Sequence, residues 1–170
     1  MSLLSEYKSS LKSIEVEEIL DLLIFRPISF IIVKLIYRTN ITPNQVSITA
    51  MFFGIFAGVF YAFSTYNFFL IAALCFFICN TLDCVDGQLA RLKKNGTKIG
   101  RIVDGFIDYV SSFFVFLGIG IALSIATGDL VYVWLLTFFA GISKALQNIF
   151  FDYYRNMYLS YVYGKASISG

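Results

Sequence analysis

Long uncharged stretches separate the charged residues of this chain. No Asp, Glu, Lys or Arg occurs in residues 39–82 or in residues 109–128. A transmembrane helix needs about 20 apolar residues, so the first stretch is long enough for two spans and the second for one. With the apolar run after residue 129, the pattern predicts four transmembrane helices. We place them at about residues 43–64, 67–92, 99–126 and 130–151, and the last can continue toward residue 161.

The segment before the first predicted span is mixed in character. Residues 1–26 are mixed and acidic, which predicts a cytosolic amphipathic lead-in, and residues 27–38 are largely apolar. In that second stretch Lys34 and Arg38 are four positions apart, so both lie on one face of a helix. The stretch is too short to span a bilayer easily, and we expect an amphipathic helix that lies in the membrane interface.

Two local signals refine the first predicted span. In the sequence Thr42-Pro43-Asn44-Gln45, Thr42 can be the N-cap, Pro43 fits the first helical position and Gln45 completes a capping box. Further along, Gly54 and Gly58 are four apart, which lets another helix approach closely. The span therefore has a defined start and a face suited to helix packing.

Composition and charge agree with a membrane protein. Apolar residues make up 58% of the 170 residues and charged residues 14%, against about 45–50% and about 25% in a soluble domain. A formal net charge of +2 is too small to indicate a nucleic-acid partner. Basic residues gather between the second and third predicted spans, at Arg91, Lys93, Lys94, Lys98 and Arg101. Because the opposite loops contain no Lys or Arg, we expect this loop and both termini to face the cytoplasm.

Four acidic residues lie where the second and third predicted spans reach the cytoplasmic side, namely Asp83, Asp86, Asp104 and Asp108. A charge inside a bilayer costs about 2.5–3.5 kcal/mol even on a lenient scale, so these acids need protons, basic partners or cations. Spacings of three and four put each pair on one helical face, beside the small residues Gly87, Ala90 and Gly100. Two such faces together would form an oxygen-rich cleft, which suits Mg²⁺ or Mn²⁺, with enough carboxylates for two ions.

The same residues belong to a longer pattern. From Asp83 to Asp108 the chain reads D-x2-D-G-x2-A-R-x8-G-x3-D-x3-D. This stretch resembles the signature of the CDP-alcohol phosphotransferase (CDP-alcohol phosphatidyltransferase) family at all eight fixed positions. From average residue usage, a chance match is on the order of one in 10¹⁰ per starting point. The segment Ile41–Asn44 is similar to the one before the family's first span, so the resemblance covers about residues 26–110 and, less distinctly, the later helices.

The resemblance implies an activity and a site. Members of the family transfer a substituted phosphate from a CDP-alcohol to an acceptor hydroxyl and release CMP. By resemblance, all four aspartates hold the metal ions, and Asp108 is also the candidate general base. The nucleotide would then be bound by Asn44, Gly87, Ala90, Arg91 and Gly100. Asn44 fits equally well as a plain helix-start residue, so both interpretations stay open.

The acceptor site is defined less sharply. Lys144 can bind an acceptor phosphate, and Arg155 is a second candidate. Either side chain can instead extend to the membrane interface. We expect CDP-diacylglycerol as donor and a polar alcohol as acceptor, in phospholipid biosynthesis. The resemblance also implies membrane lipids and a second copy of the chain, in a homodimer, as partners.

The number of spans departs from the family pattern. The resemblance implies six spans after a short interfacial helix, whereas the sequence predicts four. Either the last two spans are absent from this chain, or the protein is a short member of the family. We divide the chain into an N-terminal helical segment at residues 1–40 and a transmembrane catalytic domain at residues 41–170. The membrane would be a bacterial or archaeal inner membrane, or the endoplasmic reticulum in a eukaryote.

Three other functions account for parts of the pattern. The nearest one reverses the substrates, so that a CDP-aminoalcohol donates to a lipid hydroxyl, and the motif does not separate the two. A divalent-cation transporter would also carry acids inside the membrane. However, these acids gather at one end of the spans, and the matched Gly, Ala and Arg positions would have no role. In a non-catalytic membrane scaffold, the aspartates would only be polar residues at the ends of helices.

Overall fold

The computed structural model describes residues 7, 10 and 19–163, and within them it contains helices and turns but no strand. In chain order the elements are the π-helical turn η2 (Asp21–Phe25) and the helices α2 (Arg26–Ile36), α3 (Pro43–Ala62), α4 (Tyr66–Lys93), α5 (Lys98–Thr127) and α6 (Leu130–Tyr163). The last four are long and apolar enough to cross a membrane. The predicted all-α membrane protein with four spans is thereby confirmed. Of the predicted lead-in at residues 1–26, residues 1–6, 8–9 and 11–18 lie outside the described residues.

The ends of the helices follow local chemistry. Thr42 caps α3, its side chain accepts from the Gln45 amide at 3.3 Å, and the Gln45 side chain accepts from the Thr42 amide at 3.0 Å. The predicted capping box is thus confirmed. At the end of α5, Gly128 adopts a left-handed conformation with φ of 73°, which a residue without a Cβ allows. The predicted continuation of the fourth span is also confirmed, since α6 runs unbroken to Tyr163.

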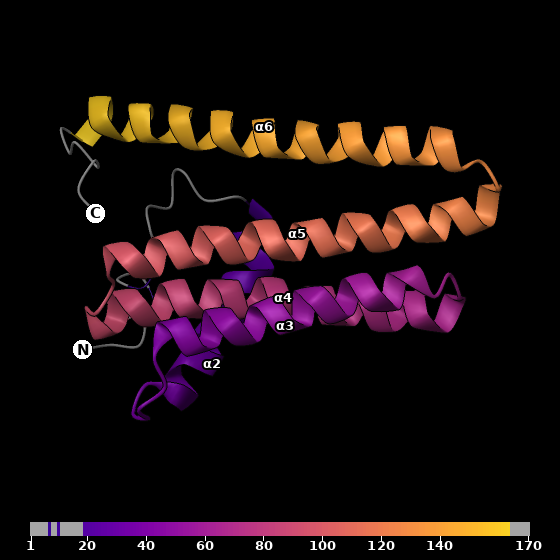
Figure 1. The fold of residues 1–170 in the computed structure, drawn as a ribbon. Coiled ribbons are helices and arrows are strands. Elements are labelled where there is room, and N and C mark those ends of the chain that lie inside the picture. Colours follow the sequence, from indigo (N-terminus) through magenta and orange to yellow (C-terminus); the bar gives the residue numbers. More distant parts are fainter. Residues whose placement is uncertain (1–6, 8–9, 11–18, 164–170) are drawn as a thin grey trace.

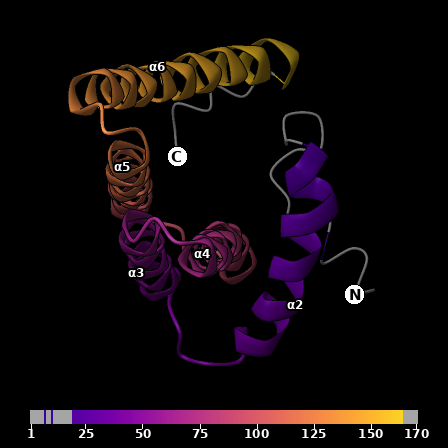
Figure 2. The ribbon, with the colours of Figure 1, turned by 90° about the vertical axis from the view of Figure 1, so that its right-hand side faces the viewer.

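Helices α3, α4 and α5 form a bundle, and α2 and α6 flank it (Figures 1 and 2). Helix α3 packs against both α4 and α5, whereas α6 packs mainly along α5. The start of α3 and the α4–α5 connection lie at the left end of Figure 1, and the other two connections between spans lie at the right end. The view along the bundle in Figure 2 shows α2 crossing transversely beside α4.

The bundle has small residues inside and large apolar residues outside. Helix α3 buries Ala50, Gly54, Ala57 and Gly58, while large side chains along its outer face, such as Phe52, are exposed. A Cβ on Gly58 would lie 2.3 Å from the Phe114 carbonyl oxygen, and one on Gly118 would lie 2.0 Å from the Gly58 carbonyl oxygen. The backbones of α3 and α5 are therefore in direct contact, as the glycine spacing predicted. This inside-out distribution is typical of helices packed within lipid.

Helix α2 packs against the C-terminal half of α4. Its Val33 is completely buried in an apolar cluster with Val46, Val85 and Leu89. Two hydrogen bonds between α2 and α4 accompany this cluster. The Ser29 hydroxyl donates to the Thr81 carbonyl oxygen at 2.9 Å, and the Gln88 amide nitrogen donates to the Arg26 carbonyl oxygen at 3.1 Å. The predicted short helix before the first span is thus present, and it braces the part of α4 that carries Asp83 and Asp86.

Candidate metal and nucleotide site

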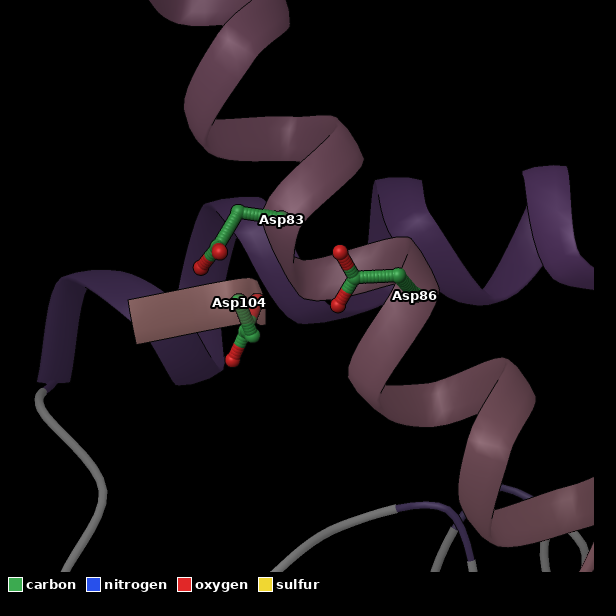
Figure 3. Close-up of side chains that lie close together, drawn as sticks. All are labelled: Asp83, Asp86 and Asp104. Carbon is green, nitrogen blue, oxygen red and sulfur yellow. The ribbon is translucent and has the colours of Figure 1, made fainter. Parts of the chain in front are cut away.

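Three of the four predicted aspartates converge at one end of the bundle. Asp83 and Asp86 come from successive turns of α4, and Asp104 comes from α5, as Figure 3 shows. One carboxylate oxygen from each residue lies within 4.8 Å of the others. Asp86 is only 5% exposed, and the other two are partly buried. The spacing of three along α4 and the packing of α4 and α5 around α3 together produce this group of carboxylates.

This group is chemically suited to a divalent cation. Three carboxylates held this close repel one another unless a positive charge or protons lie between them. Carboxylate oxygens are the ligands that Mg²⁺ and Mn²⁺ prefer. The donor set therefore fits such a cation, and Asp83, Asp86 and Asp104 are the residues that would hold it.

Asp108 occupies a different position from the other three. It lies one turn beyond Asp104 on α5, is exposed, and lines a cleft between α5 and α6. The group of three described above does not include it. The structure thus separates the four acids into a compact group and a neighbour at the mouth of a cavity.

A serine that the sequence analysis did not single out also belongs to this site. The Ser47 hydroxyl, from α3, donates to Oδ2 of Asp86 at 2.5 Å. Both residues are buried, with Ser47 4% exposed. The only signal in the sequence is that Ser47 lies one turn after the helix start at Pro43. Which carboxylate a serine of α3 contacts depends on how α3 and α4 pack.

The residues predicted to bind the nucleotide lie around the same end of the bundle. A Cβ on Gly100, at the start of α5, would lie 3.1 Å from Oδ1 of Asn44, at the start of α3. A Cβ on Gly87 would lie 3.4 Å from a terminal nitrogen of Arg91, so the guanidinium extends back over Gly87. Ala90 lies on the next turn of α4, where its Cβ would be 3.9 Å from a Cβ on Gly96. The packing therefore brings Asn44 beside Gly100 and Arg91 beside Gly87.

Two basic side chains at this end make contacts that the sequence did not predict. Nε of Arg91 donates to the Ser10 carbonyl oxygen at 2.6 Å, which links α4 to the N-terminal segment. Nζ of Lys93 donates to the carbonyl oxygens of Thr39 and Ile41 at 2.9 and 2.8 Å. Lys93 thereby ties the connection before α3 to the end of α4, in addition to any role in membrane topology.

The cleft between α5 and α6 has a volume of about 680 Å³. Toward Asp108 its lining is polar, with Lys144, Asn148 and Asp152 from α6. Farther along, its walls are apolar and largely aromatic, formed by Phe113, Phe116, Leu117, Trp134 and Phe138. The cavity therefore joins a charged end beside Asp108 to an apolar channel between two membrane helices.

The two predicted acceptor residues are placed differently. Lys144 lines the cleft on the wall opposite Asp108. Arg155 is not among the lining residues. Its guanidinium pairs with Asp152 at 2.7 Å and lies 5.6 Å from the centre of the Phe151 ring. Of the two, only Lys144 has direct access to the cavity beside Asp108.

The chain matches a known protein family. A sequence model of the CDP-alcohol phosphatidyltransferase family matches residues 40–167, most of the 170-residue chain. The matched region begins just before α3 and includes all four aspartates. No curated protein matches the chain.

Proposed function

The chain belongs to the CDP-alcohol phosphatidyltransferase family, and we propose that it transfers the phosphatidyl group of CDP-diacylglycerol to the hydroxyl of a polar alcohol. Membership makes it a phosphotransferase whose substrates are a CDP-alcohol and an acceptor alcohol. Its four apolar helices make it an integral membrane protein. The observation that carries the proposal is the convergence of Asp83, Asp86 and Asp104 from two helices within 4.8 Å.

We propose that these carboxylates and Asp108 hold two divalent cations, Mg²⁺ or Mn²⁺. Three oxygen donors in a half-buried position support a hard cation, and Asp108 on the next turn of α5 supports a second ion beside it. When bound, the ions would neutralise the diphosphate and stabilise CMP as leaving group. The α2–α4 contacts at Ser29 and Gln88 would keep these ligands in place.

The nucleotide would bind between the starts of α3 and α5 and the end of α4. Asn44 beside Gly100, and Gly87 under Arg91, support this location. Small residues at these positions and at Ala90 leave room for a ligand, and a guanidinium forms strong hydrogen bonds with phosphate oxygens. Arg91 would therefore face the diphosphate, and the diphosphate would bind next to the three carboxylates.

The acceptor would enter by the cleft between α5 and α6. Its hydroxyl oxygen would attack the phosphorus that carries the lipid, and the bond from this phosphorus to the CMP oxygen would break. Asp108 would take the hydroxyl proton, since it is the acid that lines this cleft. Lys144 on the opposite wall would bind an anionic group of the acceptor. Arg155, paired with Asp152, would contribute only indirectly.

The orientation and assembly follow the same reasoning. The carboxylates lie at the end of the bundle that holds Arg91, Lys93 and Lys94, whereas the two connections at the other end contain no Lys or Arg. By the positive-inside rule, the site would face the cytoplasm. The family resemblance supports a homodimer as the working form.

A second candidate function has the same reaction, but the lipid is the acceptor and not the donor. The aromatic walls of the cleft extend away from Asp108, and such walls suit the acyl chains of a lipid. A lipid hydroxyl at Asp108 could therefore be the acceptor, with a soluble CDP-aminoalcohol as donor. The identity of the CDP substrate separates the two candidates.

The test is CMP release by the purified protein in Mg²⁺. CDP-diacylglycerol is offered with glycerol 3-phosphate, inositol, inositol phosphate and serine, and CDP-ethanolamine and CDP-choline are offered with diacylglycerol. We expect release with CDP-diacylglycerol and one polar acceptor. Release only with a CDP-aminoalcohol and diacylglycerol would replace the first candidate by the second. Bound CDP without release from any pair would contradict both.

A further inference from the structure

Asp86 receives a hydrogen bond from outside the group of carboxylates. We propose that Ser47 is a positioning residue, which orients the Asp86 carboxylate for cation binding; this inference rests on the metal site of the proposed function. The Ser47 hydroxyl donates to Oδ2 of Asp86 at 2.5 Å, and the two residues are 4% and 5% exposed. The contact joins α3 to α4 across the interior of the bundle.

The start of α3 explains why the hydroxyl reaches this carboxylate. The capping box at Thr42 and the proline at position 43 fix the first turn, and Ser47 follows one turn later on the face toward α4. Its hydroxyl also lies 3.1 Å from the Pro43 carbonyl oxygen. The hydroxyl has one proton, and a hydrogen bond to a charged carboxylate is about twice as strong as one to a neutral acceptor. The Ser47 hydroxyl therefore donates its hydrogen bond to Asp86, and not to the Pro43 carbonyl oxygen, whenever that carboxylate is charged.

Thr49 shows what the same kind of side chain does without a carboxylate nearby. It also lies on α3, but it is exposed, and its hydroxyl donates back to the Gln45 carbonyl oxygen at 2.9 Å. That local bond is the ordinary choice of a hydroxyl inside a helix. Ser47 has the equivalent acceptor in Pro43 and, in addition, the carboxylate of Asp86. This additional acceptor, which Thr49 lacks, assigns Ser47 to the proposed metal site.

The consequence is a fixed orientation of one cation ligand. With Oδ2 bound to Ser47, the carboxylate of Asp86 cannot rotate freely, and its other oxygen is available for a cation. Removing a hydrogen-bond partner of a metal ligand typically lowers metal affinity or activity by about 10–100-fold. Ser47 also lies three residues after Asn44, hence on the same side of α3. One helix start would therefore orient both a cation ligand and a residue proposed to contact the nucleotide.

The experiment compares Ser47→Ala, Ser47→Thr and the control Thr49→Ala in the full chain. Mn²⁺ binding is measured by electron paramagnetic resonance without substrate, and the Mg²⁺ dependence of CMP release is measured in parallel. We expect Ser47→Ala to bind Mn²⁺ about 10–100-fold more weakly and to need correspondingly more Mg²⁺. Ser47→Thr keeps the hydroxyl and should restore binding, and Thr49→Ala should match the original protein.

Each other outcome has a defined meaning. Unchanged Mn²⁺ binding by folded Ser47→Ala would overturn the proposal, and so would an equal loss in Thr49→Ala, which would indicate a general loosening of α3. If Ser47→Ala does not fold, Ser47→Cys decides, because a thiol of similar size is a weak donor and should still weaken Mn²⁺ binding. An original protein that binds no Mn²⁺ would overturn the metal site itself, and this result is distinguishable from a failure of Ser47 alone.

Discussion

The two sides of α5 differ in how they are packed. On one side, α5 meets α3 through Gly58 and Gly118, with backbone atoms in contact. On the other side, α6 leaves a cleft of about 680 Å³. Among the 18 most apolar consecutive residues of α6, 6% are buried, against 33% for α3. A single helix thus separates a closely packed bundle from an open cavity.

This difference matches the two tasks that we propose. The three converging carboxylates must be held within about half an ångström of the binding geometry, which close packing provides. An acceptor must enter and its product must leave, which an open cleft permits. Asp104 and Asp108 are one turn apart on α5, yet one belongs to the group of carboxylates and the other lines the cleft.

Removing the carboxylate at the cleft should have the largest effect. Asp108→Asn keeps the size of the side chain but cannot accept the proton of the hydroxyl. We expect turnover to fall by about 10²–10⁴-fold while CDP binding stays measurable by calorimetry. Asp129→Asn, in the loop at the opposite end of α5, is the matched control and should keep its turnover. A near-normal rate for Asp108→Asn would rule out this residue as the base.

Chelation should separate chemistry from folding. With excess EDTA we expect CMP release to stop and to return when Mg²⁺ is added in excess. The helix content, measured by circular dichroism, should stay unchanged, because packing of the bundle relies on small apolar residues. Full activity in the chelator would remove the metal from the proposed mechanism.

Adding one methyl group should have opposite effects on the two sides of the bundle. At Gly118→Ala the new Cβ would meet the backbone of Gly58 at 2.0 Å, so we expect a loss of about 1–3 kcal/mol in the free energy of unfolding. At Gly141→Ala, on α6, the new Cβ would meet nothing within 4 Å beyond the neighbouring backbone of its own helix. There we expect no loss, or a gain of up to about 1 kcal/mol from helix propensity. Reversible unfolding in mixed micelles measures both, and equal losses would contradict the packing difference.

Lys144 tests the charged end of the cleft. If it binds an anionic acceptor, Lys144→Gln should raise the KM for that acceptor by about tenfold or more, because a hydrogen bond to a charged group contributes about 1.5–3 kcal/mol. The KM for the CDP-alcohol should not change. Lys34→Gln, on α2 and outside the cleft, is the control. An increase in the KM for the donor instead would move Lys144 from the acceptor site to the nucleotide site.

Thr42→Ala should have the smallest effect. It removes the N-cap of α3, and we expect a loss of about 0.5–2 kcal/mol in the free energy of unfolding. The metal affinity should decrease only slightly, since Ser47 and Asp86 are held by the packing of α3 and α4 as well as by the cap. A drop in metal affinity as large as that of Ser47→Ala would mean that the cap, not the serine, orients the carboxylate.

Local sequence patterns were enough to predict the helices and the kinds of residue in the site. Uninterrupted apolar stretches define spanning helices because an unsatisfied backbone group costs several kcal/mol in lipid, and a helix satisfies its groups locally. The capping box at Thr42 depends only on neighbouring residues, so it was predictable. The spacing of Asp83 from Asp86, and of Asp104 from Asp108, likewise fixed which acids share a helical face.

How those faces meet depends on the packing of the helices against one another. Helical spacing puts Asp104 and Asp108 on one side of α5, but the packing of α3, α4 and α6 separates them into two surroundings. The hydrogen bond from Ser47 to Asp86, and those from Lys93 to the connection before α3, join residues far apart in the chain. Local periodicity contains no information about such contacts, because they depend on the relative rotation and depth of whole helices. The close approach of α3 and α5 at their glycines sets the rotation and the depth of these helices. The sequence indicates only that glycine allows such an approach.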